Sequence, residues 1–454
     1  MDMKIIVSGC GKIGSTIIAS LVAEGHDVVV LDNDPEVVTE MTNIYDVMGV
    51  CGNCADCETL ADAGIEQAEL YIAAAGSDEL NMLSCFLAKR MGASSTIARI
   101  RNPEYNDASL DFMKTELGLS MAINPELMSA KFLCDILNMP SVAKIESFSG
   151  RSFEMIELKL KEDSVLDGMN LAQLREKFKT HVLIGVVQRG DEVYIPGGNF
   201  VLQAGDKIGL TSSPAELQKF LRQIGLVQKK AKNVMILGGS RIGYYLAKML
   251  EGSSSVKIIE KDPKVAEELT ETLPESVIIK GDGAMQELLL EEGISSTDAF
   301  VSLTGMDELN ILMSLYAMNM KVPKVIVKAN RGELSKMSEN LGLDCVISPR
   351  KIIADVIVRY ARALENSRGS LVETLYKLMD GRVEALEFYV SGAIDGITGI
   401  PLRELKRKSG ILIAGIARGR KTIVPGGNDC IMTGDRVVVL AANQRLSDLS
   451  EIIG

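Results

Sequence analysis

The chain has 454 residues, 46% of them hydrophobic and 24% charged, a composition typical of a soluble globular protein with about three or four domains. Its 61 acidic and 49 basic residues give a formal net charge of -12, which disfavours nucleic acid and a direct lipid anchor as partners. No apolar run approaches the roughly 18 residues of a membrane-spanning helix, and the first residues lack the features of a signal peptide. We therefore expect a cytoplasmic protein.

The first 122 residues alternate short Val- and Ile-rich runs with stretches of helical periodicity, the pattern of a parallel sheet wound with helices. The expected strands cover residues 5–8, 28–31, 45–50, 70–74 and 96–100. We predict a Rossmann-like domain over residues 1–122 and a connecting helix within 123–141. Residues 142–226 change to amphipathic strands, one helix and a Pro-Gly-Gly turn, which indicates a smaller α+β domain.

The second half repeats the first at a constant offset of 229 residues. KIIVSGCGKIG at 4–14 matches NVMILGGSRIG at 233–243, SDELNM at 77–82 matches MDELNI at 306–311, and YIPGGN at 194–199 matches IVPGGN at 423–428. We therefore expect an α/β fold with two tandem Rossmann-like, doubly wound parallel sheets, each followed by a smaller α+β domain. The corresponding ranges are 232–350 for the second Rossmann-like domain, 351–369 for its connecting helix and 370–454 for its small domain.

A glycine-rich loop, GCGKIG at residues 9–14, lies between the first expected strand and a helix. Gly9 allows the tight turn, Gly11 lets the backbone approach a pyrophosphate, and Gly14 lets helix and strand pack closely. Asp32, at the end of the second strand, suits the two hydroxyls of an adenosine ribose. The neutral Asn33 beside it favours NAD or ATP over NADP. The expected nucleotide contacts in this loop and strand are Gly9, Gly11, Lys12, Ile13, Gly14 and Asp32.

The second copy of this loop reads GGSRIG at residues 238–243, with an acid again near the end of the next strand. Its middle glycine is replaced by Ser240, whose side chain could crowd a pyrophosphate or merely shift it, so the sequence leaves open whether the second site is occupied, altered or empty. Lys12 and Arg241 occupy equivalent loop positions, where a cation suits a polyanionic ligand or is simply a solvated surface charge. The candidate residues of this second site are Gly238, Ser240, Arg241, Ile242, Gly243 and Glu260.

Ligands of such sheets bind beyond the carboxyl ends of the strands. Ala74, in a run of small residues after the fourth strand, leaves room for a ligand against the backbone. Arg99 and Arg101, at the end of the fifth strand, are a pair of guanidinium groups suited to phosphates. Their counterparts are Lys328 and Asn330, so we expect the first site to prefer the more highly charged ligand.

Two alternatives to a nucleotide-binding protein without catalytic activity are an oxidoreductase and a protein with a metal or redox site. A soluble NAD-dependent oxidoreductase with a duplicated cofactor domain needs a proton donor near the nicotinamide, but neither His26 nor His181 is well placed for this. The spacing of Cys51, Cys54 and Cys57 is compatible with a metal or redox site. The matching residues 280–286 read KGDGAMQ, without these ligands, so we expect no metal and no catalytic residue.

The order and spacing of these motifs resemble one family. A Rossmann-like domain and a small domain in tandem, with GCGKIG, SDELN, ARIR at residues 98–101 and a Pro-Gly-Gly turn, are similar to the TrkA family, the cytosolic regulatory subunits of Trk-type potassium uptake systems, which are built from RCK domains. The resemblance covers essentially the whole chain. Cys54, in the turn after the third strand, and Ser240 depart from the family pattern.

The resemblance implies a protein that binds NAD(H) or ATP/ADP. It also implies a homo-oligomer, with four subunits expected in a ring, that gates a membrane-embedded Trk-type potassium transporter subunit and lies on the inner face of the cell membrane through that partner. A nucleotide that binds one conformation better than another would shift the ring between states. The family's phosphate loop, ribose acid and basic pair correspond to Gly9, Gly11, Gly14, Asp32, Arg99 and Arg101.

Overall fold

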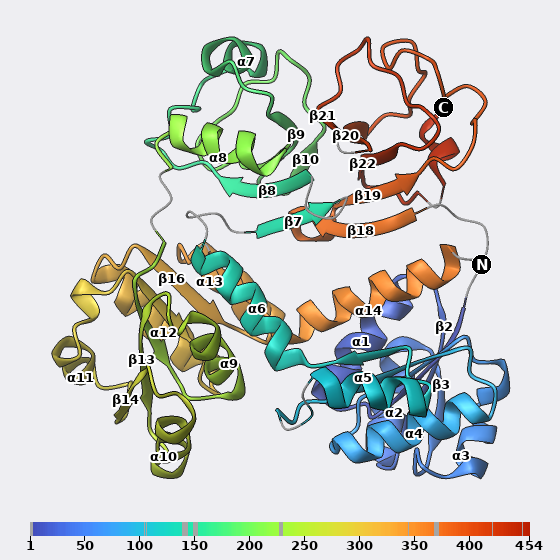
Figure 1. The fold of residues 1–454 in the computed structure, drawn as a ribbon, viewed down its shortest axis with the longest axis vertical. Coiled ribbons are helices and arrows are strands. Elements are labelled where there is room, and N and C mark those ends of the chain that lie inside the picture. The colour runs from blue at the N-terminus through green and yellow to red at the C-terminus, as the bar shows by residue number, and fades with distance from the viewer. Residues whose placement is uncertain are drawn as a thin grey trace. The chain divides into compact units, whose positions relative to one another are not determined.

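The structure is a computed structural model, and Figure 1 shows its fold. It describes residues 3–103, 105, 107–138, 144–148, 153–226, 230–343, 345–366, 372–419, 421–446 and 448–454. The chain forms two compact units, one made of Met1–Leu137 with Ala231–Val358 and the other of Asn138–Lys230 with Arg359–Gly454. Each unit thus joins like parts of the two sequence repeats. The expected domain boundaries at 141–142 and 369–370 lie outside the described residues.

The first half of the first unit is a six-stranded parallel sheet with strand order β3-β2-β1-β4-β5-β6. Its strands are β1 (Lys4–Ser8), β2 (Asp27–Asp32), β3 (Met48–Cys51), β4 (Leu70–Ala73), β5 (Ser95–Arg99) and β6 (Met121–Ile123). The intervening helices are α1 (Lys12–Ala23), α2 (Pro35–Tyr45), α3 (Cys57–Asp62), the 3-10 turn η1 (Ile65–Gln67), α4 (Asp78–Arg90) and α5 (Asp107–Leu117). The order reverses between β1 and β4, where Rossmann-like sheets bind their ligands.

The second half of this unit repeats the topology in the order β14-β13-β12-β15-β16-β17. Its strands are β12 (Asn233–Leu237), β13 (Ser255–Glu260), β14 (Val277–Lys280), β15 (Ala299–Ser302), β16 (Lys324–Lys328) and β17 (Val346–Ile347). Its helices are α9 (Arg241–Leu250), α10 (Pro263–Thr272), α11 (Gln286–Glu291), η3 (Ile294–Ser296), α12 (Asp307–Asn319) and α13 (Gly332–Asn340). The matching strand orders confirm the predicted pair of Rossmann-like sheets.

The third strand differs from its predicted range of residues 45–50. Tyr45 is the last residue of α2, and Asp46 ends the helix with a left-handed φ of 50°, its N–H donating to the carbonyl of Thr42. Only from Met48 does the chain become extended, as β3. The prediction was wrong here because apolar residues lie on both sides of the change, Ile44 and Tyr45 in the helix and Val47 and Met48 just after it, so hydrophobicity alone does not mark the change of backbone conformation.

The connecting helices are α6 (Pro125–Asn138) and α14 (Pro349–Asn366). Although α6 belongs to the first repeat, it packs in the core of the second repeat's sheet. Its Ala130, Leu133 and Leu137 are fully or almost fully buried in one cluster with Val234 and Ile236 of β12. The carboxyl end of α6 is held from β16, where the Nζ of Lys324 donates to the carbonyls of Ile136 at 2.7 Å and Leu137 at 3.4 Å.

The second unit contains two five-stranded antiparallel sheets. The first, in the order β10-β9-β11-β8-β7, contains β7 (Lys144–Phe148), β8 (Phe153–Lys159), β9 (Leu183–Arg189), β10 (Glu192–Tyr194) and β11 (Lys207–Ser212), with helices α7 (Leu171–Phe178) and α8 (Pro214–Gln223). The second, in the order β18-β19-β22-β20-β21, contains β18 (Val372–Leu378), β19 (Val383–Tyr389), β20 (Ile411–Arg418), β21 (Lys421–Ile423) and β22 (Arg436–Ala442), with turns η4 (Met379–Gly381) and η5 (Leu449–Ile452).

The two small domains share a core of buried side chains from both repeats, among them Phe153, Val186, Val383 and Leu440. The buried carboxylate of Glu157 also crosses between them and accepts a hydrogen bond from the backbone N–H of Met379 at 2.9 Å. These contacts and the sheet pairings confirm the predicted smaller α+β domains. Among the helices of the described residues, none combines the length and the apolar character of a membrane span.

Gly415 on β20 has no room for a side chain. A Cβ added there would overlap the ring of Phe153, whereas a Cβ at the exposed Gly197 would meet no atom within 4 Å. We expect Gly415→Ala to lower the free energy of unfolding by about 1–3 kcal/mol, the usual effect of overpacking a core, and Gly197→Ala to change it by under about 0.5 kcal/mol. Urea denaturation of the full chain measures both. Equal stabilities for the two variants would contradict this packing.

The buried Lys324 makes the stability of the first unit depend on pH in a predictable direction. Burial lowers the pKa of Lys324 from its usual 10.5 to about 8, an effect that the nearby thiol of Cys345 partly offsets. The unfolded chain therefore binds this proton up to a higher pH than the folded chain, so this lysine's contribution to stability increases as pH rises from about 8 towards 10.5. We expect the stability of wild type relative to Lys324→Met to increase over this range.

Thermal unfolding at pH 7, 8, 9 and 10 measures this difference. Lys264→Met, at an exposed position of α10, is the matched control, and we expect its difference from wild type to stay constant with pH. A constant difference for Lys324→Met as well would show that the lysine titrates alike in the folded and unfolded chains.

Candidate functional site

The glycines of the first loop have different structural roles. Gly9 has a left-handed φ of 83°, and a Cβ there would lie 2.5 Å from the backbone nitrogen of Ala75. A Cβ on Gly14 would overlap the carbonyl oxygen of Gly9, whereas one on Gly11 would meet no atom within 4 Å. Gly9 and Gly14 are thus required by the fold, while Gly11, next to the start of α1, leaves open space beside the helix amino terminus.

Asp32 is anchored against this loop. One carboxylate oxygen accepts a hydrogen bond from the N–H of Cys10 at 2.6 Å, and the other accepts one from the N–H of Asp34 at 3.1 Å. Glu260 makes the same pair of contacts in the second repeat, with the N–H groups of Gly239 at 2.6 Å and Asp262 at 2.7 Å. Each acid is therefore fixed at the carboxyl end of its strand.

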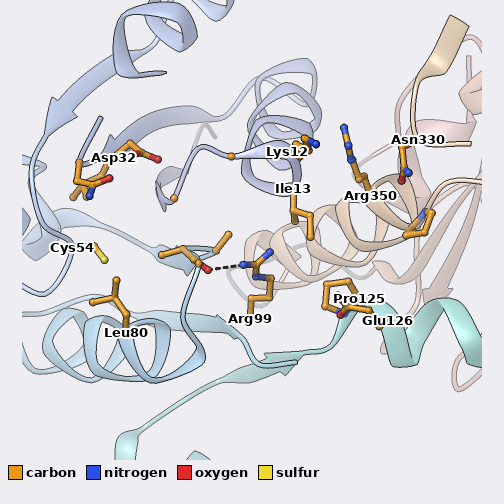
Figure 2. A pocket seen from close by; sticks show the side chains of 18 of the residues that line it. Lys12, Ile13, Asp32, Cys54, Leu80, Arg99, Pro125, Glu126, Asn330 and Arg350 are labelled. Carbon is orange, nitrogen blue, oxygen red and sulfur yellow. Dashed lines mark hydrogen bonds between the residues drawn. The ribbon is translucent and has the colours of Figure 1, made fainter. Parts of the chain in front are cut away.

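A cavity of about 650 Å³ lies at the switch point of the first sheet. Figure 2 shows Asp32 and Cys54 on one side of it, and Arg350 and Asn330 on the other. Eight of the predicted site residues line it, namely Gly9, Gly11, Lys12, Ile13, Asp32, Ala74, Arg99 and Ile242. The other seven are not among its lining residues, namely Gly14, Arg101, Gly238, Ser240, Arg241, Gly243 and Glu260.

The predicted arginine pair has two separate roles in the structure. Arg99 is 7% exposed and lines the cavity, where its guanidinium donates to the carbonyl of Ala75 at 2.6 Å (Figure 2) and its Nε has no hydrogen-bond partner among the described residues. Burial lowers its pKa. Arg101 instead donates to the carbonyl of Gly76 at 2.8 Å, and its Nε lies 3.7 Å from Asp78. Of the pair, only Arg99 faces the cavity.

The repeated Asp-Glu-Leu-Asn motif holds the loops around the site. Asn81 is fully buried, donates to the carbonyls of Ala75 at 3.1 Å and Arg99 at 2.9 Å, and accepts from the N–H of Ala75 at 2.8 Å. Asp78 accepts from the N–H of Arg101 and that of Asn102, each at 2.8 Å. Ser77 is the N-cap of α4, its side chain accepting a hydrogen bond from the N–H of Leu80.

In the second loop, a side chain caps the amino terminus of the helix that follows. The hydroxyl of Ser240 accepts a hydrogen bond from the N–H of Gly243 at 3.4 Å and so caps α9. At the end of β16, Lys328 is 9% exposed and donates to the carbonyl of Leu303 at 3.2 Å. The serine hydroxyl therefore accepts the hydrogen bond of an amide at the start of α9. At the corresponding start of α1, no side chain caps the helix.

Several lining residues were not singled out from the sequence, among them Leu80, Pro125, Glu126, Pro349 and Arg350. The last four begin the two connecting helices, so they reach the site from far along the chain. Each helix starts with a proline followed by a charged residue, a pattern that marks the two starts as equivalent but does not place them at a cavity.

The cysteines also differ from one another. Cys54 lines the cavity, is 6% exposed and has its pKa raised by burial, whereas Cys51 and Cys57 are exposed. Within the described part of the chain, no group of three His, Cys, Asp or Glu side chains is arranged to hold a metal ion. Buried, protonated thiols are poor nucleophiles, so Cys54 contributes shape to the cavity rather than reactivity.

The different surroundings of Gly11 and Gly14 predict different effects of the same substitution. Gly11→Ala should keep the stability of wild type and weaken nucleotide binding, because its Cβ enters open space beside the helix amino terminus. Gly14→Ala should destabilise the chain by more than about 1 kcal/mol, because its Cβ meets backbone. Thermal unfolding and titration with ADP separate the two effects. A strongly destabilised Gly11→Ala would contradict this assignment.

Comparison with known proteins places the fold in a family. The TrkA-N domain model matches residues 5–125 and 234–349, and the TrkA-C domain model matches residues 155–225 and 395–454. The "Trk system potassium uptake protein TrkA homolog" of Archaeoglobus fulgidus is 32% identical over 99% of this chain and 100% of its own length. The TrkA protein of Haemophilus influenzae is 29% identical over 98% of this chain and 96% of its own length.

Solved structures agree in fold. The GsuK RCK domain has a TM-score of 0.62 at 17% identity, covering 97% of this chain and 93% of that one. The GsuK channel bound to NAD has a TM-score of 0.63 at 17% identity, covering 97% of this chain and 77% of that one. The relatives are named as potassium uptake proteins and RCK domains rather than enzymes, in agreement with the prediction that the chain is not an enzyme. The chain belongs to the TrkA family of Trk-system potassium uptake proteins.

Proposed function

We propose that this chain is a nucleotide-binding regulatory subunit that gates a membrane-embedded Trk-type potassium transporter subunit. The observation that carries the proposal is the cavity at the switch point, where the glycine loop and the anchored Asp32 meet the buried Arg99. This is the arrangement in which Rossmann-like domains hold an adenine dinucleotide or a related nucleotide. The names of the relatives supply the link to potassium uptake.

The ligand proposed is NAD(H) or ATP/ADP. The ribose hydroxyls bind to Asp32, the phosphates lie between Gly11 and the amino terminus of α1, and Arg99 faces their negative charge. Asn33 lines the cavity beside Asp32 and offers no cation for a 2′-phosphate, which favours NAD over NADP. Solved structures of similar fold are described as a GsuK channel bound to NAD and as GsuK bound to ADP.

The second loop is proposed as a weaker nucleotide site, formed by Gly238, Ser240, Arg241, Ile242, Gly243 and Glu260. Ser240 occupies the N–H of Gly243, which a pyrophosphate would otherwise bind. The first loop therefore carries the main regulatory site.

The proposed assembly is a homotetrameric ring on the cytoplasmic side of the membrane, attached through the transporter subunit. A ligand shifts a conformational equilibrium only by its difference in affinity for the two states. Because the cavity is lined from both Rossmann-like domains, a bound nucleotide contacts both and favours one arrangement of the pair. Such a change would be transmitted through the ring to the transporter.

Asp32→Ala tests the site directly. Losing the ribose contacts should weaken NADH, ATP and ADP alike, by roughly tenfold or more, because all three contain the same adenosine. The N–H of Cys10 loses its acceptor, so we expect an accompanying stability loss of about 1 kcal/mol, too small to unfold the chain. Glu40→Ala, an exposed carboxylate on α2, is the control and should bind as wild type does. Calorimetric titration measures the affinities.

The same variants test the regulatory part of the proposal. In cells deficient in potassium uptake, wild type and Glu40→Ala should each support uptake when co-expressed with a Trk-type membrane subunit, and Asp32→Ala should alter its rate. Failure of wild type to bind any of the three nucleotides would reject the nucleotide site. Unchanged uptake by an Asp32→Ala chain that has lost binding would reject gating by the nucleotide.

A further inference from the structure

The cavity has a charge opposite to that of the whole protein. The chain has a formal net charge of -12, yet the charged side chains lining the cavity are four cations (Lys12, Arg99, Lys328 and Arg350) and two carboxylates (Asp32 and Glu126). Asp32 already accepts two backbone hydrogen bonds. An excess of positive charge in a concave site attracts an anion. Figure 2 places Glu126, like Arg350, on the side opposite Asp32, and the cations of the cavity outnumber its carboxylates.

Arg350 is placed where helix electrostatics disfavour a cation. The connecting helices α6 and α14 begin alike, with Pro125 followed by Glu126 and with Pro349 followed by Arg350. Glu126 suits the positive end of the helix dipole, whereas α14 has no acidic residue in its first turn. Among the described residues, Arg350 also makes no hydrogen bond or ion pair that would offset this cost.

Two further cations line the same end of the cavity. Lys12 extends from the start of α1, and Figure 2 shows its side chain and that of Arg350 directed to the same part of the cavity. Within the described chain, the Lys12 ammonium has no hydrogen-bond or ion-pair partner either. Lys328 is buried, its Nζ donates to the carbonyl of Leu303, and Asp307, the acid whose charge acts on it, is already bound by the N–H groups of Asn330 and Arg331.

We infer that Lys12, Lys328 and Arg350 form a phosphate-binding corner that makes the cavity prefer a nucleoside polyphosphate to oxidised NAD. Guanidinium and ammonium groups are the side chains that hold phosphate oxygens, and here they come from both sequence repeats. Oxidised nicotinamide carries a positive charge and is repelled by the same three cations. The inference rests on the proposed nucleotide site and names the class of ligand that it takes.

The identity of residue 350 sets this preference. A glutamate there, as at the equivalent helix start of α6, would place a carboxylate beside the phosphate, and like charges repel. Arg350→Glu therefore reverses the charge of the corner without touching the glycine loop or Asp32. Lys351→Glu is the matched control, because it makes the same change of net charge at the next residue, which is exposed and does not line the cavity.

The experiment titrates the full chain with ATP, ADP and NAD in buffer containing EDTA, so that only the protein's own cations contact the phosphates. For Arg350→Glu we expect ATP affinity to fall by roughly tenfold or more, ADP affinity to fall less, and NAD affinity to stay constant or rise. Lys351→Glu should keep the wild-type ratio of ATP to NAD affinity. Arg350→Gln, which removes charge without reversing it, should give an intermediate ratio.

Two outcomes would overturn the inference. If Arg350→Glu and Lys351→Glu change the ratio of ATP to NAD affinity equally, only the net charge matters and the corner holds no phosphate. If ATP affinity stays at the wild-type value in Arg350→Glu while Asp32→Ala abolishes binding, the proposed nucleotide site stands and the corner alone is rejected. A wild-type chain that binds none of the three ligands would reject the proposed site itself, together with the inference that rests on it.

Discussion

The close contact between Gly14 and the carbonyl of Gly9 governs the geometry of the candidate site. Because no Cβ fits there, α1 starts directly against the end of β1, and its first residues, Lys12 and Ile13, line the cavity. The N–H of Cys10, between these glycines, is bound by Asp32 from the neighbouring strand. The loop, the helix start and the acid are thereby fixed relative to one another before any ligand arrives, which lowers the conformational entropy lost on binding.

The two repeats have kept this framework and changed its charges. Both retain the glycine contact, the acid that binds the loop and the buried asparagine that joins two loops, as Asn81 and Asn310 show. The two repeats differ in the side chains that they present to a ligand. The second repeat has the capping Ser240 in its loop, a lysine in place of the buried Arg99, and Arg350 in place of Glu126 at the helix start. Duplication has preserved the scaffold while the two sites have diverged.

The parts that the sequence predicted well depend on local rules. The parallel sheets followed from strand periodicity. The glycine loop could be recognised because its glycines have a direct steric purpose, and seven residues predicted for the first site line one cavity together with Ile242, which was predicted for the second. The start of β3 was predicted too early, because Tyr45 belongs to a helix whose apolar residues continue into the strand. Glu126 and Arg350 were missed because they are brought to the cavity by tertiary packing, which no local pattern records. Arg101 was expected to act with Arg99, but local spacing could not show that Gly76 and Asp78 engage its guanidinium.

The position of α6 bears on how the duplicated chain arose. Its apolar face, including Leu133 and Leu137, is buried against the sheet of the other repeat rather than its own. A single repeat would leave that face uncovered, and exposed apolar surface of this kind drives association. A chain with one repeat alone would therefore need a second copy to cover this helix, and the duplicated chain supplies that copy within one polypeptide. In an assembly of identical copies, every substitution is present in each copy. In the duplicated chain, a substitution in one half is absent from the other half, so the two halves can differ.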